Sequence, residues 1–205
     1  MSELPMFPLG TVLLPSMVMP IHVFEPRYRV LARRCVDGDG ELGVVLIERG
    51  SEVGGGDIRC HVGTRARLLQ AAELEDGRWV LGLVGVERIR VDRWLPDDPY
   101  PRAEVSSFAG EPAGPDAAGS RAHVERLLRR VLALKAELGE SATPATVALD
   151  PDPDVAAWQA TALAPLGPFD AQRVLESGGA DERLALVASL LEDEAAVLAQ
   201  RVAGG

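Results

Sequence analysis

The side chains that carry phosphoryl-transfer or serine–lysine chemistry are almost absent from this sequence. Its 205 residues include a single lysine, Lys135, which lies between Leu134 and Ala136. A phosphate-binding loop needs a glycine, a lysine and a hydroxyl residue in succession, and no such run occurs. A serine–lysine pair would need the same Lys135, which falls on a predicted amphipathic helix. We therefore interpret Lys135 as a solvated lysine on a helix surface.

Histidine and cysteine, which bind transition metals and act as bases or nucleophiles, are also scattered. His22, His61 and His123 form no two-histidine helical pair, and Cys35 and Cys60 make no short ligand spacing. By periodicity both cysteines point toward a core, where a thiol behaves as a small, inert hydrophobic group. The sequence therefore predicts no metal, no cofactor and no catalytic residue. The alternative is an enzyme whose carboxylate and histidine meet only in the fold.

One acidic run, Asp150-Pro151-Asp152-Pro153-Asp154, has the composition of a calcium ligand set. It lacks the central glycine and the closing glutamate of a calcium-binding hand. We interpret it as a solvated linker ahead of a helix, with Asp154 as the N-cap.

The chain as a whole is acidic. It carries 21 basic and 31 acidic residues, for a formal net charge of -10. A negative surface repels phosphate backbones, so general nucleic-acid binding is disfavoured. The N-terminus has no signal-peptide pattern, and no apolar run reaches the roughly 18 residues of a membrane span. We therefore expect a cytoplasmic protein with no membrane contact.

The N-terminal half predicts a small, partly closed β-barrel with one inserted helix. Apolar residues at helical spacing over residues 26–36 (Tyr28, Leu31, Ala32 and Cys35) indicate the helix, and Pro26 suits its first position. Prolines at 5, 8 and 15 restrict the first extended segment to a sheet edge or a short stretch. The predicted extended segments cover residues 11–14, 17–24, 42–47, 60–68, 79–84, 87–92 and 100–108.

The C-terminal half predicts helices. Residues 109–119 have the composition of a linker, and Ser120 is a candidate N-cap for the helix that follows. Further helices are expected at about 155–163, from Pro168, and at about 181–202. The domain organisation predicted is a barrel over residues 1–108, a linker over 109–119 and a helical bundle over 120–205.

Several segments resemble the N-terminal substrate-binding domain of the Lon protease. The similarity is most specific over residues 4–15 (LPMFPLGTVLLP) and 19–28 (MPIHVFEPRY), and it continues through residues 42–47, 85–88 and 100–105. In the helical half, residues 174–176 and 181–184 are similar to the closing helices of the family. The resemblance implies an α+β fold, with a PUA-like β pseudo-barrel followed by a C-terminal α-helical bundle.

The same resemblance implies a function. In the family this unit precedes an ATPase and a peptidase and helps to engage substrate proteins. Here the sequence stops where the ATPase would begin, so we expect a stand-alone member. The expected role is that of a non-catalytic polypeptide-binding module, an adaptor or sensor for unfolded or exposed segments. Its partners would be unfolded substrates or a separate protease.

Five apolar residues of a segment that is broken by Pro15 and Pro20 are the candidate peptide-binding residues. A small barrel has limited room to bury them, and methionine adapts to varied partners. The alternative is that they close one end of the barrel or contact the helical bundle, because most apolar residues at such spacing belong to a core. The five residues are Leu14, Met17, Met19, Ile21 and Phe24.

A second function is an RNA- or nucleotide-binding module, since PUA-like folds elsewhere bind RNA. Its support is the arginine-rich helix that carries Arg27, Arg29, Arg33 and Arg34. No aromatic ladder for base stacking accompanies these arginines, so a solvated rim beside the apolar stripe is favoured.

We also predict a structural ion pair between Glu25 and Arg88. A buried carboxylate needs a partner, and arginine can bind it through two parallel hydrogen bonds. The pair would connect the start of the inserted helix to the sheet.

Overall fold

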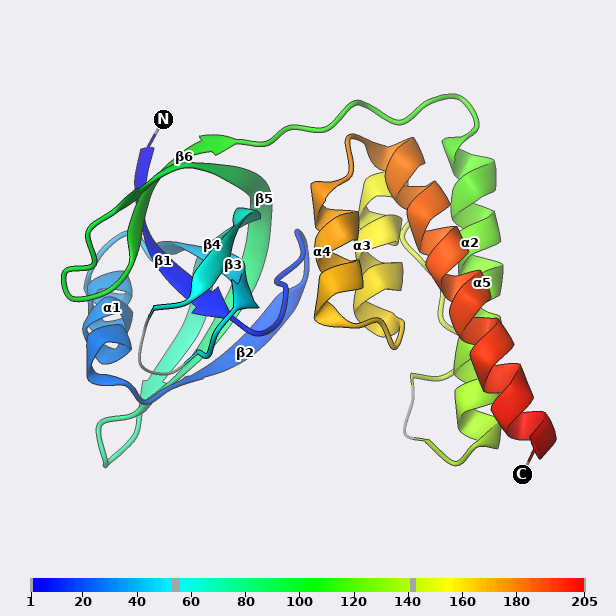
Figure 1. The fold of residues 1–205 in the computed structure, drawn as a ribbon, viewed down its shortest axis with the longest axis horizontal. Coiled ribbons are helices and arrows are strands. Elements are labelled where there is room, and N and C mark those ends of the chain that lie inside the picture. The colour runs from blue at the N-terminus through cyan, green and yellow to red at the C-terminus, as the bar shows by residue number, and fades with distance from the viewer. Residues whose placement is uncertain (1, 53–55, 141–142, 205) are drawn as a thin grey trace. The chain divides into compact units, whose positions relative to one another are not determined.

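The chain forms two compact units in a computed structural model that describes residues 2–52, 56–140 and 143–204. The first unit is Met1–Ala109 and the second is Gly110–Gly205 (Figure 1). The sequence of residues 51–57, with three consecutive glycines, predicts a loop, and part of this segment lies outside the described residues. The protein is of mixed α+β class.

The first unit is a closed ring of strands with one more strand attached. The strand order is β2-β5-β4-β3-β1-β6, and an additional β5–β6 pairing closes β5, β4, β3, β1 and β6 into a ring. The strand β2 pairs with β5 beside the segment that pairs with β6, so it remains outside the ring. The described strands are β1 (Ser2–Leu9), β2 (Val18–Val23), β3 (Glu41–Arg49), β4 (Ile58–Glu73), β5 (Trp79–Leu95) and β6 (Arg102–Ser107).

The first strand corrects the expected placement of the prolines. It begins at Ser2, includes Pro5 and Pro8, and lies between β3 and β6 rather than at an edge. Its first half pairs with β6 and its second half with β3, so each half is bonded on one side. The Met6 N–H donates to the Pro101 carbonyl, just before the start of β6. The backbone nitrogen of Pro8 faces the same side of β1, where β6 no longer offers an acceptor. Neither proline therefore interrupts a hydrogen-bond ladder.

The helix α1 (Pro26–Asp37) covers the ring as its periodicity predicts. Pro26 opens it, and Tyr28, Leu31, Ala32 and Cys35 form its buried face. The Tyr28 ring stacks on Phe7 of β1 with centroids 4.4 Å apart. Burying these side chains is worth about 2 kcal/mol for each of the larger ones, which fixes the helix on the barrel.

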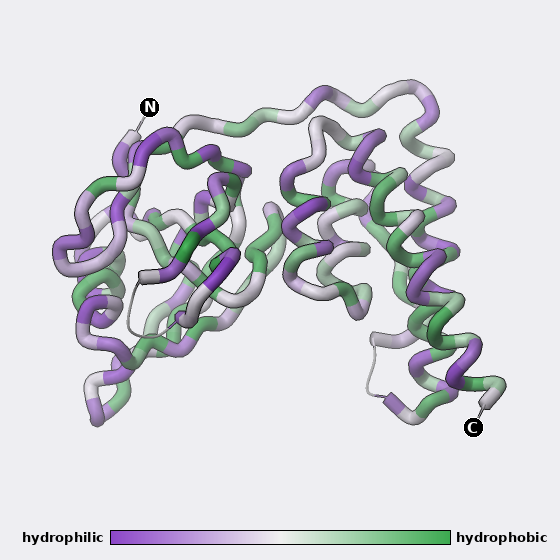
Figure 2. The backbone as a smooth tube through the Cα atoms, viewed as in Figure 1, coloured by the Kyte–Doolittle hydropathy of each residue, from purple (hydrophilic) through white to green (hydrophobic). Residues whose placement is uncertain are grey.

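The second unit is helical. Figure 2 shows hydrophobic and hydrophilic segments alternating along α2 and α5, as expected of helices with one buried face. Leu128 and Val131 of α2, with Val187 and Leu191 of α5, are fully buried. The helices are α2 (Ala117–Glu137), α3 (Pro153–Leu163), α4 (Pro168–Glu176) and α5 (Ala180–Gly204).

Two helix starts differ from the sequence prediction. The N-cap of α2 is Asp116 rather than Ser120. The carboxylate of Asp152, not Asp154, caps α3 by accepting hydrogen bonds from the N–H groups of Asp154 and Val155. Pro153 can occupy the first helical position because that position needs no N–H donor, and this moves the cap back by two residues.

No described helix combines the length and the apolar composition required to cross a membrane.

Candidate functional site

The alternation of β2 decides which side chains of the predicted binding segment reach the surface. Ile21 and Val23 are buried in the barrel core and Met19 packs against it. The residues between them, Val18, Pro20 and His22, are exposed. Because successive side chains of a strand point to opposite faces, the even-numbered residues form the outer face.

The five sequence-predicted binding residues are therefore divided between core and surface. Leu14 is 3% exposed and Ile21 is buried, so neither presents a surface to a partner. Met17 and Met19 are half-buried. Phe24 is 53% exposed and keeps its predicted accessibility. Val18, which the prediction omitted, is 64% exposed.

The outer face continues across the neighbouring strands. Val18 pairs with Val84 of β5, and Val86 lies two residues further along that strand. Leu69 lies at a register shift of β4, next to the residue that pairs with Leu83. Val18, Val86 and Leu69 are all exposed large apolar side chains. We define the outer patch as Val18, Pro20, Leu69, Val84 and Val86.

The free edge of β2 lacks one hydrogen-bond donor, at Pro20. The Gly85 N–H donates to the Met17 carbonyl over 2.9 Å, which directs the backbone groups of odd-numbered β2 residues toward β5. The even-numbered residues consequently face the free edge, and Pro20 there has no N–H. A proline at such a position weakens pairing with an incoming strand.

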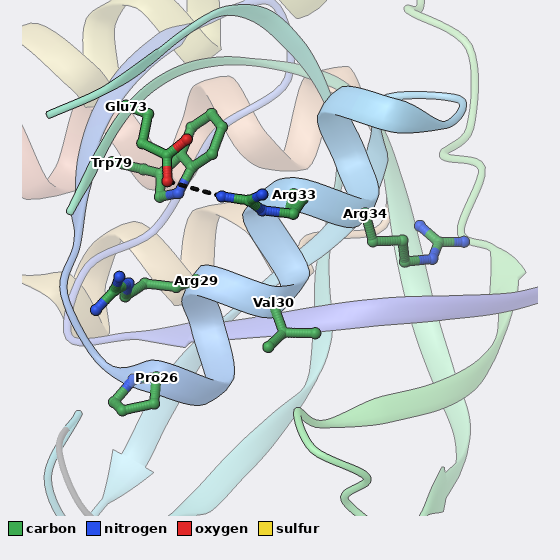
Figure 3. Close-up of a pocket in the computed structure, with 7 residues that line it drawn as sticks. All are labelled: Pro26, Arg29, Val30, Arg33, Arg34, Glu73 and Trp79. Atoms are coloured by element: carbon green, nitrogen blue, oxygen red, sulfur yellow. Dashed lines mark hydrogen bonds and ion pairs between the residues drawn. The ribbon is translucent and has the colours of Figure 1, made fainter. Parts of the chain in front are cut away.

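A pocket of about 480 Å³ lies between α1 and the ends of β4 and β5. Figure 3 shows Glu73 and Trp79 on one side and the helix residues on the other. The Arg33 guanidinium donates to the Glu73 carboxylate over 2.8 Å and lies 5.9 Å from the Trp79 ring centre. The α1 pocket is lined by Pro26, Arg29, Val30, Arg33, Arg34, Glu73 and Trp79.

The pocket adjoins the strand that carries the outer patch. Trp79 pairs with Val23, the last residue of β2, and Pro26 follows three residues later. The exposed ring of Phe24 belongs to the connection between them.

The arginines of α1 do not form the continuous basic stripe that an RNA-binding role would use. Arg27 forms an ion pair with Glu25, with 3.2 Å between Nε and Oε2, and its guanidinium carbon lies 4.5 Å from the Tyr28 ring centre. Arg34 lies 3.7 Å from the carboxylate of Asp39. Within the described parts of the chain, Arg29 makes no ion pair, although its guanidinium lies close to Gly77.

The predicted ion pair between Glu25 and Arg88 is wrong. Glu25 pairs with Arg27, while the Arg88 guanidinium lies 4.4 Å from the Phe108 ring centre. The register explains the separation: Val23 is opposite Trp79, and Arg88 lies nine residues further along β5, opposite Thr64. Glu25 lies beyond the other end of that pairing.

The side chains that could take part in catalysis or bind a metal are dispersed over the two units. His22 and His61 are exposed on the barrel, and His123 lies 3.6 Å from Glu192 in the helical unit. Lys135 lies 3.7 Å from Glu140. Cys35 is buried as predicted, and burial raises the pKa of its thiol to about 11, whereas Cys60 is half-exposed rather than fully buried. Across the described ranges, no three histidine, cysteine or acidic side chains are grouped as a metal site would require.

The fold and this surface define a class of protein: a mixed α+β module with a closed β-barrel, a C-terminal helical unit and an exposed apolar face on the barrel. The chain belongs to the family of the ATP-dependent protease La (LON) substrate-binding domain, which matches residues 3–193.

Solved structures and sequenced relatives agree with this assignment. The crystal structure of Lon N-terminal domain protein from Xanthomonas campestris is 27% identical with a TM-score of 0.66, covering 92% of this chain and 98% of that one. The N-terminal domain of Mycobacterium avium complex Lon protease, 18% identical, shares the fold with a TM-score of 0.69, covering 94% of this chain and 99% of that one.

Lon protease 2 of Herpetosiphon aurantiacus is 29% identical over 206 residues, which cover 96% of this chain and 24% of that protein. Lon protease of Cytophaga hutchinsonii is 33% identical over 108 residues, covering 51% of this chain and 13% of that protein. The chain thus spans about a quarter of the length of the first of these relatives.

Proposed function

We propose that this protein binds exposed segments of other polypeptides through the outer patch and the adjoining α1 pocket, without transforming them. The role would be that of an adaptor or sensor for unfolded chains. The observation that carries the proposal is the group of exposed apolar side chains on β2, β4 and β5, in a family described as the substrate-binding domain of Lon.

The patch favours recognition of side chains over addition of a strand. Val18 and Leu69 expose 64% and 57% of their surface, so apolar area is available for burial by a partner. At roughly 25 cal/mol per Å² of apolar area removed from water, a few such contacts support weak binding that releases readily. Pro20 meanwhile removes a donor from the edge that a bound strand would use.

The experiment is a titration of the protein against a permanently unfolded chain. Fluorescence anisotropy of labelled α-lactalbumin, reduced and capped with iodoacetamide, reports binding directly. Val18→Asp should lower the affinity by about tenfold, because a charge replaces a buried apolar contact in the complex. Val197→Asp is the matched control, since Val197 is 54% exposed on α5, outside the barrel unit.

Equal losses in the two variants, or no binding by the unchanged protein, would contradict the proposal. A parallel assay of ATP hydrolysis and of peptide cleavage tests the non-catalytic part. Turnover that disappears on substitution of a polar residue of this chain would contradict that part.

A further inference from the structure

We infer that the α1 pocket selects, within the binding function proposed above, segments in which an aspartate or glutamate side chain stands beside a bulky apolar residue. This inference rests on the proposed function and adds the class of segment that the site prefers. The pocket combines an arginine with no carboxylate partner among the described residues, an arginine that is already paired, and apolar surface between them.

Arg29 is the group that would bind the acid. It lines the pocket from α1, and Figure 3 shows its side chain extended away from the paired Arg33 and Glu73. A Cβ built on Gly77 would lie 2.1 Å from Nη2 of Arg29, so the guanidinium rests against the backbone of the β4–β5 turn. The guanidinium therefore lies beside this turn and has no carboxylate partner among the described residues. A carboxylate from a partner would complete a charge-assisted hydrogen bond there.

Glu73 determines where in the pocket that carboxylate can bind. The Glu73 carboxylate already accepts a hydrogen bond from Arg33 over 2.8 Å, and it would repel a second carboxylate placed beside it. Arg29 and Arg33 are four residues apart on one helix and therefore neighbours on one face. The partner carboxylate is accordingly directed to Arg29, away from Glu73.

The remaining lining explains the requirement for an apolar neighbour. Val30, between the two arginines in sequence, is 51% exposed, and Pro26 is exposed at the start of the helix. Trp79 lines the same pocket as a nearly buried aromatic surface. An apolar side chain next to the acid would cover Val30 and remove its surface from water.

The charges that line the pocket favour one acidic side chain over a nucleic-acid backbone. The pocket presents three arginines and one glutamate in a chain of formal net charge -10. A phosphate backbone needs a series of cations along its path, whereas Arg27, Arg33 and Arg34 are already engaged with Glu25, Glu73 and Asp39. One unengaged guanidinium suits a single carboxylate.

The test compares fluorescein-labelled peptides by fluorescence anisotropy at low salt. The first peptide is C-terminally amidated and has one glutamate between two leucines; the second replaces this glutamate by glutamine. The glutamate peptide should bind about tenfold more tightly, and the ratio should shrink as salt rises. A third peptide, the glutamine form with a free C-terminal carboxylate, should bind like the amidated glutamine form.

Two substitutions with opposite expected effects separate the inference from a loss of folding. Arg29→Gln should abolish the preference for glutamate and leave binding of the glutamine peptide unchanged. Glu73→Gln should raise the affinity for the glutamate peptide by about threefold, because it releases Arg33 and removes a repelling charge. Arg130→Gln, at an exposed arginine of α2, is the control and should change neither affinity.

The possible results are distinct. Equal affinity for the glutamate and glutamine peptides, or a preference retained by Arg29→Gln, overturns the inference while the proposed function stands. Tighter binding of the free C-terminal carboxylate, or of a single-stranded oligonucleotide through Arg29, also overturns it. Failure of every peptide and of the unfolded protein to bind overturns the proposed function itself.

Discussion

The guanidinium carbon of Arg183 lies 3.8 Å from the centre of the Trp158 ring. Arg183 is 1% exposed and forms an ion pair with Asp154 of α3, and burial lowers the pKa of its guanidinium. Within the described part of the chain, its Nε is buried without a hydrogen-bond partner, and Asp154 provides a counter-charge at Nη1. The contact joins the start of α5 to α3.

Replacement of Asp154 by alanine should therefore destabilise the helical unit. The buried guanidinium would lose its counter-charge, at a cost of about 2 kcal/mol in the free energy of unfolding, reduced from the fully buried case because Asp154 is itself half-exposed. Urea denaturation followed by circular dichroism at 222 nm measures the loss. Asp193→Ala, at an exposed site on α5, should change the same free energy by less than about 0.5 kcal/mol. Equal effects would disprove the role of the pair.

Gly85→Ala should disrupt the contact between β5 and the segment before β2. A Cβ at this position would lie 2.3 Å from the Leu14 carbonyl oxygen and 3.1 Å from Cα of Pro15, and both neighbours are backbone atoms. We expect a loss of about 2 kcal/mol or more in the free energy of unfolding. Gly119→Ala on α2 has no neighbour within 4 Å and should instead stabilise the protein by about 0.5 kcal/mol, since alanine favours a helix.

Stability should fall in alkaline solution because of Cys35. Burial raises the pKa of this thiol from 9.0 to about 11, so the folded protein keeps a proton that the unfolded chain releases. The contribution is complete below pH 9 and declines as the pH rises toward 11, by about 1 kcal/mol at pH 10. Cys35→Ala should show a smaller decline between pH 8 and pH 10 in urea titrations. Tyr28, whose pKa is raised to about 12, affects both proteins alike. Parallel curves would refute the assignment to Cys35.

Glu125→Ala should release the segment that precedes α3 from α2. The Glu125 carboxylate accepts a hydrogen bond from the Leu149 N–H over 3.0 Å and pairs with Arg121 and Arg129. The Leu149 hydrogen bond, followed by the two arginines, lowers the pKa of this carboxyl. The protection factor of the Leu149 amide, which is its exchange rate corrected for the intrinsic effect of pH, should fall on substitution, and in the unchanged protein as the pH falls through that lowered pKa. A protection factor that is insensitive to both changes would contradict this.

The sequence-predicted binding residues of segment 17–24 are divided between the two faces of β2, because the sequence pattern did not distinguish these faces. Residues 17–24 contain apolar side chains at both odd and even positions, so shifting the pattern by one residue exchanges surface and core. His22 is the polar residue that indicates the outer face, and with it Val18 and Phe24. The helix α1 was predictable because its stripe has a single phase, with Tyr28, Leu31 and Cys35 on one side.

The α1 pocket could not be predicted from local pattern. Arg33 and Glu73 are 40 residues apart in the sequence, and they meet because the β4–β5 hairpin extends beside the helix. The error over Glu25 and Arg88 has the same origin: β5 has 17 residues, and only its register shows that Arg88 lies far from the end of β2. Contacts between residues so far apart in the sequence depend on how the sheet closes, and no short sequence motif encodes that closure.

Pro20 also influences how the protein behaves at high concentration. Because Pro20 has no N–H on the free edge of β2, a second copy of this chain cannot form an uninterrupted hydrogen-bond ladder along that edge. Association of barrels into longer sheets through β2 is therefore disfavoured.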